Sequence, residues 1–381
     1  MSQSARNTVY LDNNATAPIR PVVLETMTAV LAAVGNPSSI HAAGRKARAR
    51  VETARGQVAA LVGASAQDVT FTGSGTEANA LAIHSAIAAG FRRLIVNPTE
   101  HPSVLETVRA TGLPIEWLEV EEDGLVAIDE IGERLQSSGD PALVVVQFAN
   151  SETGVVQTFP EVAEVCRRFG AWLHVDAVQA VGRIPTDVRG MGDTWALSAH
   201  KLGGPQGVGA VVNITGRTLT PNLRGGGQER GMRAGTENVA AVTGFGAAAE
   251  AALNDFDAIA RQKPWRDAAL ARMEAVGAEA VGPGAWILPN VLSAAVEDWP
   301  SSMQVMALDL AGVMVSAGSA CSSGKVAKSP VLEAMGQSRL SGGVIRASGG
   351  WATTEADWVR FADVWIEAYG AYRARRQERA A

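Results

Sequence analysis

Short apolar segments alternate with helix-length segments along the first two thirds of this 381-residue chain, and this alternation most constrains the fold. Near-continuous apolar strands separated by helices are typical of a mainly parallel sheet that is covered on both faces. The sequence therefore predicts an α/β fold whose large domain contains a seven-stranded, mainly parallel sheet. The expected strands are residues 68–71, 93–97, 115–120, 142–148, 172–177, 194–198 and 207–213.

The pattern changes after an Ala-rich helical segment at Gly244–Leu253, where shorter and less regular elements follow. A chain of this length is long enough for about two domains. We expect a large domain over residues 14–255 and a smaller α+β domain made from residues 1–13 and 256–381.

Charge and patterning exclude several function classes. The net charge of −6 argues against a nucleic-acid partner, and the basic runs Gly44–Arg50 and Tyr372–Arg379 are interpreted as solvated helix faces. The sequence has no signal-peptide pattern and no apolar run of membrane-spanning length, so we expect no membrane contact. Its two cysteines do not form a disulfide framework, which favours the cytoplasm.

A glycine-rich turn follows the first expected strand, in "TGSGTEANAL", and opens a helix with Thr76 in its first turn. Ligands of such sheets bind at the carboxyl ends of the strands. Free backbone amides at a helix N-terminus can hold a phosphate group. The pattern is neither a dinucleotide fingerprint nor a Walker loop, and a plain tight turn remains an alternative.

Other polar residues follow later strands, where the ends of a parallel sheet converge. They are His101, Asn150, Ser151, Asp176 and Gln179. Taken singly, such an Asp can be a helix cap and such a His a structural residue. Their repetition at successive strand ends indicates a site, because binding residues are concentrated on loops.

Lys201 lies between an apolar strand and a glycine turn in "TWALSAHKLGGPQGVGA". A desolvated lysine can attack a carbonyl as a neutral amine and form a Schiff base. The alternative is a lysine whose ammonium group reaches solvent. A phosphate cradle, an acid, a histidine and a lysine are together the set that pyridoxal phosphate requires, which favours the first interpretation.

Nine motifs in order give the chain its resemblance to a known family. They are "YLDNNATAP", "GNPSSIH", "FTGSGTEAN", "TEHPSV", "NSETGVVQ", "HVDAVQAVG", "SAHKLGGPQGVG", "RGGGQERGMRAGTEN" and "SAGSACSSGKV". Together they resemble the cysteine desulfurases, class V members of the fold-type-I pyridoxal-phosphate-dependent transferases, over nearly the whole chain. The wording around the second cysteine resembles the first subgroup, which has a long cysteine loop.

The resemblance implies a role for each matched residue in cofactor binding. Lys201 would hold pyridoxal phosphate as a Schiff base, Asp176 would pair with the pyridinium nitrogen, His101 would stack on the ring and assist proton transfer, Gln179 would contact the ring hydroxyl, and Gly75, Thr76, Ser198 and His200 would hold the phosphate. Many relatives have a second asparagine where this chain has Ser151, so whether Asn150 or Ser151 contacts the cofactor stays open. Thr236 would reach the phosphate of a neighbouring subunit, which implies a homodimer.

The resemblance also implies a substrate, L-cysteine, which Arg346 and Asn36 would bind, with Arg346 holding its carboxylate. The second cysteine, Cys321, lies among Ser, Gly, Ala and Lys residues that cannot bury it, whereas a packing cysteine belongs among hydrophobes. It would accept the sulfur as a persulfide while L-alanine is released, with Lys325 and Lys328 favouring the thiolate. Cys166 lies in an amphipathic helical pattern and is expected in the core.

An iron–sulfur scaffold protein or another acceptor would then receive the sulfur. No intrinsic metal is expected, although Cys321 could bind an iron–sulfur cluster transiently together with a scaffold partner. Three alternatives stay open: a selenocysteine lyase, another class V aminotransferase or lyase, and a non-catalytic partner of the same fold.

Overall fold

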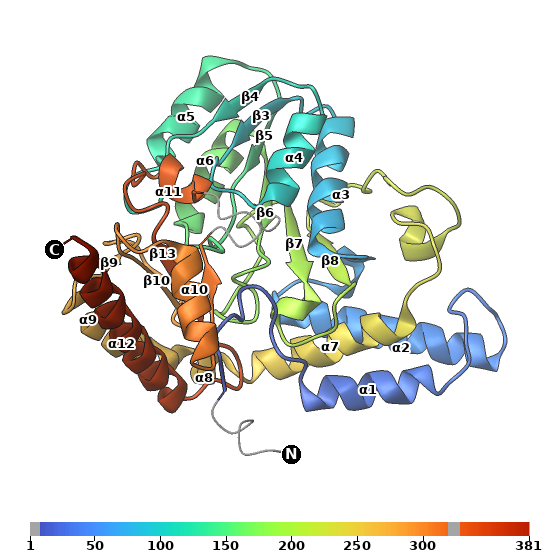
Figure 1. The fold of residues 1–381 in the computed structure, drawn as a ribbon. Coiled ribbons are helices and arrows are strands. Elements are labelled where there is room, and N and C mark those ends of the chain that lie inside the picture. Colours follow the sequence, from blue (N-terminus) through green and yellow to red (C-terminus); the bar gives the residue numbers. More distant parts are fainter. Residues whose placement is uncertain (1–7, 319–327, 381) are drawn as a thin grey trace.

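The computed structural model describes residues 8–318 and 328–380, and a seven-stranded sheet forms the centre of its larger part (Figure 1). The strand order is β2-β8-β7-β6-β5-β3-β4, parallel from β7 to β4, with β8 antiparallel to both of its neighbours. The seven predicted strands and the α/β class are therefore confirmed. The strands are β2 (Val69–Thr72), β3 (Arg93–Val96), β4 (Ile115–Trp117), β5 (Ala142–Val145), β6 (Trp172–Asp176), β7 (Thr194–Ser198) and β8 (Gly209–Asn213).

Helices cover both faces of this sheet. Side chains along each strand alternate between the two faces and pack against the helices on either side. In β3, Leu94 and Val96 pack with α3 and α4, whereas Ile95 belongs to the core that includes α2, α6 and α7. Helix α5 packs on α6, and α1 packs on α7. These helices are α1 (Pro21–Leu31), α2 (Ala42–Leu61), α3 (Gly75–Ala88), α4 (Pro102–Ala110), α5 (Ile128–Ser137), α6 (Phe159–Phe169) and α7 (Val239–Leu253).

The remaining elements form a smaller α+β part around an antiparallel sheet of order β12-β13-β10-β9. Its core contains the buried rings of Trp299, Trp358, Phe361 and Trp365. We propose that this part is the smaller domain, with the boundaries that the sequence predicts. Its elements are β1 (Val9–Tyr10), α8 (Phe256–Ala260), α9 (Gln262–Glu274), β9 (Glu279–Ala280), β10 (Val291–Ala295), α10 (Ser301–Leu310), β11 (Val313–Met314), β12 (Ser316–Ala317), α11 (Pro330–Ala334), β13 (Val344–Ser348) and α12 (Glu355–Ala380).

The N-terminal segment connects the two parts. Strand β1 pairs with β11, and the backbone N–H of Leu11 then donates to Met314 O at 2.9 Å. Six residues farther on, the chain has reached the larger part, where the backbone N–H of Ala17 donates to His200 O at 2.9 Å. Residues 12–16 therefore lie between the two sheets.

No helix within residues 8–318 and 328–380 has both the length and the apolar character needed to cross a membrane. Cys166 lies on the buried side of α6, with 2% of its surface exposed. Burial, and then the charge of Asp193, raise the pKa of its thiol to about 12. This position agrees with the core role expected from its helical pattern.

The burial of Cys166 predicts a thiol that does not react in the folded protein. In the variant Cys321→Ser, which leaves one of the two cysteines, a thiol reagent at pH 8 should label the native protein negligibly. The same reagent should label one thiol per chain after denaturation. Rapid labelling of the native variant would contradict the buried position.

Candidate active site

A cavity of about 420 Å³ lies at the carboxyl ends of the parallel strands. Polar residues that follow β2, β5, β6 and β7 line it, because these strands all end at the same edge of the sheet. Nine residues singled out in the sequence share this cavity: Gly75, Thr76, His101, Ser151, Asp176, Gln179, Ser198, His200 and Lys201. The fold thus brings together residues that are up to 126 positions apart, from Gly75 to Lys201.

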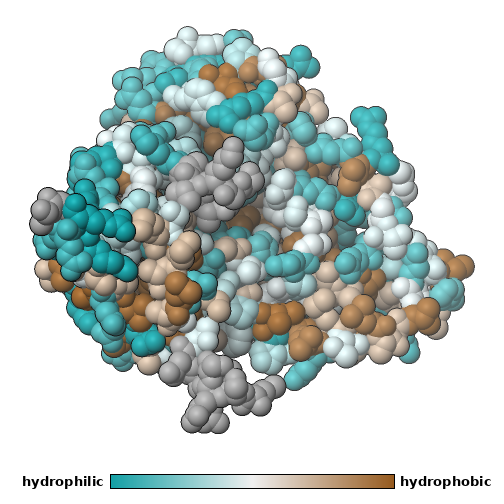
Figure 2. Space-filling view, viewed as in Figure 1, coloured by the Kyte–Doolittle hydropathy of each residue, from teal (hydrophilic) through white to brown (hydrophobic). Residues whose placement is uncertain are grey.

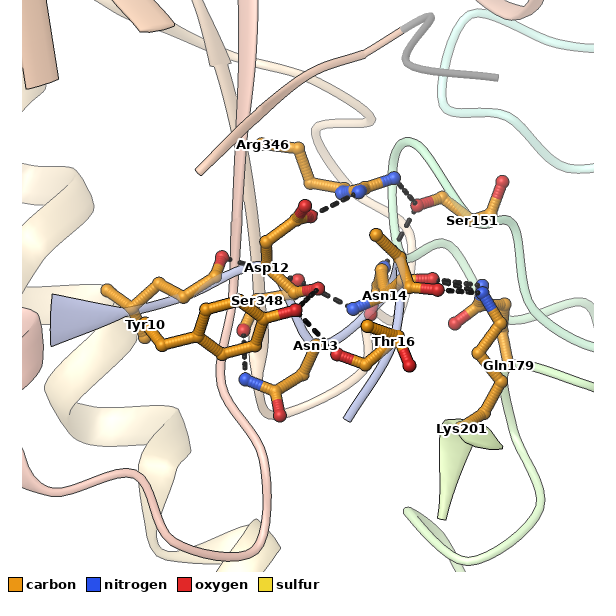
Figure 3. Close-up of polar contacts among 12 residues, drawn as sticks. Tyr10, Asp12, Asn13, Asn14, Thr16, Ser151, Gln179, Lys201, Arg346 and Ser348 are labelled. Atoms are coloured by element: carbon orange, nitrogen blue, oxygen red, sulfur yellow. Dashed lines mark hydrogen bonds and ion pairs between the residues drawn. The ribbon is translucent and has the colours of Figure 1, made fainter. Parts of the chain in front are cut away.

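Lys201 ends the short 3₁₀ helix η3 (Ala199–Lys201), directly after β7. Its ammonium group donates hydrogen bonds to the backbone oxygens of Asn14 and Ala15, the second at 2.9 Å. Figure 3 shows Lys201 and Gln179 both pointing toward Asn14. The Gln179 side chain donates to the same Asn14 oxygen at 3.1 Å. Carbonyl oxygens of the N-terminal segment therefore hold the amine inside the cavity.

Asp176 is fixed by a chain of side chains that the sequence reading missed. His174, fully buried in β6, lies with Nε2 3.0 Å from Asn79 Oδ1, and Asn79 Nδ2 donates to Asp176 Oδ2 at 2.8 Å. Burial lowers the pKa of His174 to about 4, despite the opposing charge of Asp176. Because Asn79 Oδ1 faces the His174 ring, the amide nitrogen of Asn79 points toward the carboxylate. A histidine inside an apolar strand was the signal that could have revealed this.

His101 caps the N-terminus of α4 and faces the cavity. Its Nδ1 accepts from the Ser103 backbone N–H at 3.1 Å and lies 2.8 Å from Ser103 Oγ. Burial lowers the pKa of His101; the nearby charge of Asp176 opposes this and that of Lys201 adds to it. Because Nδ1 is an acceptor, the proton of the neutral ring lies on Nε2.

The first turn of α3 lines the cavity and provides an anion cradle. Ser74 caps the helix by accepting from Glu77 N at 3.1 Å, and the backbone N–H groups of a first helical turn have no partner within the helix. A Cβ at Gly75 would lie 3.1 Å from Val178 Cγ2 and 3.3 Å from Ser198 Cβ, so glycine allows the helix to approach β7 closely.

His200 completes the cradle as a neutral ring. Burial, and then the charges of Lys201 and Arg183, lower its pKa to about 4. Its Nδ1 lies 3.2 Å from Thr16 Oγ1 of the N-terminal segment. The cradle therefore offers hydrogen-bond donors and nearby positive charge, which suit a phosphate or another anion.

Three residues predicted for this site do not line the cavity. Asn150 is 3% exposed and builds a turn, because its Oδ1 accepts from the backbone N–H groups of Glu152 and Thr153 at 2.8 and 2.9 Å. Thr236 lines a separate cavity of about 250 Å³. Asn36 is exposed and accepts from Ser38 N at 2.8 Å.

Arg346 lies near the cavity, on β13 of the smaller part, and is 3% exposed. Its guanidinium pairs with Asp12 at 2.7 Å and donates to Ser151 O at 3.0 Å (Figure 3). Cys321 and Lys325 lie outside the described residues, while Lys328 is within them. Within the described residues, no group of three His, Cys, Asp or Glu side chains could hold a metal ion.

Glu100, next to His101, is a buried acid near this site that the sequence analysis did not identify. It is 3% exposed, and no hydrogen bond of good geometry reaches its carboxyl oxygens from the described residues. Burial, and then the charge of Asp176, raise the pKa of Glu100 well above its usual value, and the backbone amides of Gln147 and His101 offset this only in part. Burial beside Asp176 therefore favours the neutral form of this acid.

Known proteins are similar to this chain both in sequence and in fold. The family profile described as aminotransferase class-V matches residues 9–361. A cysteine desulfurase from Cereibacter sphaeroides is 40% identical over 368 residues, which are 93% of this chain and 94% of that protein. The solved structure of a NifS-like protein from Rickettsia africae ESF-5 matches with a TM-score of 0.87 and 31% identity, and covers 95% of this chain and 99% of that one. The structure described as SspA in complex with cysteine matches with a TM-score of 0.78 and 27% identity, over 90% and 98% of the chains.

The raised pKa of Glu100 predicts a pH-dependent gain in stability for Glu100→Gln. Because the folded-state pKa of Glu100 is raised, the acid contributes most to the free energy of unfolding at low pH. This contribution falls as pH rises, by up to about 1.4 kcal/mol per pH unit above the unfolded-state pKa. The free energy of unfolding of the variant, measured with urea, should therefore increase relative to that of the parent between pH 5 and pH 8. Glu106→Gln, at an exposed site on α4, is the matched control. A difference that does not change with pH would contradict the neutral buried acid.

Proposed function

This chain belongs to the class-V aminotransferases and, within them, to the cysteine desulfurase family, and we propose that it uses pyridoxal phosphate to move sulfur from L-cysteine to Cys321. The observation that carries the proposal is the shared cavity, in which Lys201, Asp176 and His101 lie beside an anion cradle. The products are L-alanine and a persulfide, whose sulfur passes to an iron–sulfur scaffold protein or another acceptor.

Several features of the cavity fit the cofactor. Gln179 Oε1 is buried and has no hydrogen-bond partner among the described residues, so it can accept from a ring hydroxyl. The Asp176 carboxylate, oriented by Asn79, suits a protonated ring nitrogen. Arg183 is buried and bonds only neutral oxygens of Asn13 and Asn14 in the described part of the chain, which leaves a positive charge for an anionic ligand to balance.

Each residue then has a task that its contacts support. When bound, pyridoxal phosphate supplies an electron sink that weakens bonds to the substrate carbons. Lys201 would hold the cofactor and Gly75, Thr76, Ser198 and His200 its phosphate, while His101 would stack on the ring and could move a proton at Nε2. Ser151, rather than Asn150, is the residue of that pair that faces the cavity.

The substrate carboxylate would bind Arg346, whose buried Nε has no hydrogen-bond partner within the described residues. The planar fork of arginine suits a carboxylate. Asp12 already pairs with this guanidinium, so the substrate shares or displaces that partner. Asn36, which is exposed and accepts from Ser38 N in its own turn, is the second residue proposed for the substrate site.

The sulfur step balances without an external oxidant. The thiolate of Cys321 attacks the substrate sulfur, an S–S bond forms, and the carbon–sulfur bond breaks. Its electron pair stays with the carbon, which takes a proton and leaves as L-alanine. The chain retains a persulfide, and the thiol proton of one reactant is carried over to the products.

We further propose a homodimer that completes the phosphate site. Thr236 lies in the second cavity with Arg233, and this cavity shares Gly73 and Gly207 with the larger one. Figure 2 shows apolar side chains gathered along α1 at the lower edge of the molecule. The exposed apolar residues there and in the loop after α1 are Val22, Leu24, Leu31, Val34 and Ile40. Such a patch suits a second copy of the chain.

Two variants test the catalytic assignment side by side. Cys321→Ser should keep the yellow absorbance of the bound cofactor but lose sulfide and persulfide formation from L-cysteine. Lys201→Ala should lose that absorbance and, with it, turnover, because the amine that holds the cofactor is gone. Release of sulfide by Cys321→Ser at the parental rate would refute the persulfide route. Turnover of selenocysteine or keto acids in place of cysteine would favour a lyase or an aminotransferase.

The dimer proposal predicts a measurable mass and a shared site. Sedimentation should give twice the chain mass of 39.6 kDa. Thr236→Ala should weaken retention of the cofactor by about tenfold, as the loss of one hydrogen bond to a charged group predicts. Thr220→Ala, in the segment that leads into the same glycine-rich loop, is the control. A monomer with tight cofactor binding would contradict the shared site.

A further inference from the structure

We propose that Glu152 is a positioning residue for sulfur transfer, because its carboxyl binds one of the two chain ends that flank the segment containing Cys321 and lies beside the other. This inference rests on the proposed function, since it assigns Glu152 a part in delivering sulfur to that thiol. The cofactor contacts described above do not involve this carboxyl group.

Both flanks meet the same carboxyl oxygen. Ser329 Oγ donates to Glu152 Oε2 at 2.6 Å. On the other side, a Cβ added at Gly318 would lie 3.1 Å from the same Oε2, so the backbone after β12 passes directly beside it. Cys321 is three residues beyond Gly318 in the chain and eight before Ser329. One side chain therefore anchors the point to which the intervening segment returns and lies beside the point from which it starts.

Ser329 transmits this contact to α11. Its hydroxyl oxygen accepts from Leu332 N at 3.1 Å and thereby caps the helix, while its proton goes to Glu152. Ser329 is fully buried, and its backbone N–H donates to Ser341 O at 3.1 Å. Loss of the carboxyl would leave the hydroxyl proton of Ser329 without this acceptor and loosen the start of α11.

Glu152 is itself anchored to the wall of the active-site cavity. The Asn150 side chain holds the turn that carries it and donates from Nδ2 to Thr99 O at 3.1 Å. Ser151, the preceding residue, lines the cavity, and its backbone oxygen accepts from Asn14 Nδ2 at 2.9 Å and from Arg346. The turn "NSETG" thus joins the cavity wall to the flanks of the Cys321 segment.

The charge state of Glu152 provides an independent signature. Burial raises its pKa to about 7, while the Ser329 hydroxyl and the charge of Arg346 act to lower it. Arg346 is the facing cation, and Asp12 is paired with it. A carboxylate is a stronger acceptor than a neutral acid, so the hold on Ser329 strengthens as pH rises through about 7.

The test compares Glu152→Ala, Ser329→Ala and the double variant in single-turnover reactions with L-cysteine. Absorbance of the bound cofactor and its change on adding cysteine report the cofactor side, and mass spectrometry after alkylation reports persulfide on Cys321. We expect the absorbance signals to persist and persulfide formation to slow by about tenfold in each single variant, with no further loss in the double variant. Ser341→Ala, which removes a neighbouring hydrogen bond to Ser338 O, should stay within about twofold of the parent.

Glu152→Gln separates positioning from general support, because it keeps an acceptor oxygen and the side-chain volume but cannot ionise. Its persulfide rate should match the parent within about threefold at pH 6, and the ratio of parental to variant rate should grow as pH rises through about 7. Comparing the two proteins at each pH cancels the titration of Cys321, which both contain.

Parental persulfide rates in Glu152→Ala and Ser329→Ala would overturn the inference, as would losses that multiply in the double variant or a pH-independent ratio for Glu152→Gln. If Glu152→Ala fails to fold, Ser329→Ala and Glu152→Gln decide the question. Failure of the parent itself to form persulfide would instead overturn the proposed function, so the two failures are distinguishable.

Discussion

The hydrogen bonds from Lys201 to the backbone oxygens of Asn14 and Ala15 join the N-terminal segment to the large sheet, and the site depends on this junction. The same segment pairs through Asp12 with Arg346 on the smaller sheet. The Lys201 amine and the Arg346 guanidinium, 145 positions apart in the chain, therefore share one short stretch of backbone. The segment has to be in place before the cavity has its shape.

Basic side chains of Lys201, Arg183 and Arg346 lie in and beside this site, and Asp12 pairs with one of them. Burial, and then the charge of Arg346, lower the pKa of Arg183 to about 9, and the histidines beside the cavity are held neutral. Such an arrangement costs free energy in the absence of an anion and favours binding of one. The N-terminus of α3 adds its dipole in the same sense. Electrostatics thus agree with the geometry in favouring an anionic cofactor and an amino-acid carboxylate.

Sequence reasoning located what local patterns encode. Apolar runs identified the seven strands, because a strand buried on both faces needs continuous hydrophobicity. The residues at the ends of those runs, together with the family resemblance, identified nine of the cavity-lining residues, since strand ends converge in such a sheet. These local patterns did not identify Asn79 and Glu100, because a buried polar residue on a helix or in a loop has no periodic signature. It also could not reveal that Asn150 would turn away to hold Glu152.

The sequence alone determined the fold class and the inventory of reactive groups, because hydrophobic periodicity and residue chemistry are local properties of the chain. Only the tertiary structure decided which groups meet: that Asp12 pairs with Arg346, that His174 contacts Asn79, which binds Asp176, and that the Glu152 carboxyl binds one flank of the Cys321 segment beside the other flank. These pairings join residues far apart in sequence. They depend on packing, burial and distance, which no local pattern specifies.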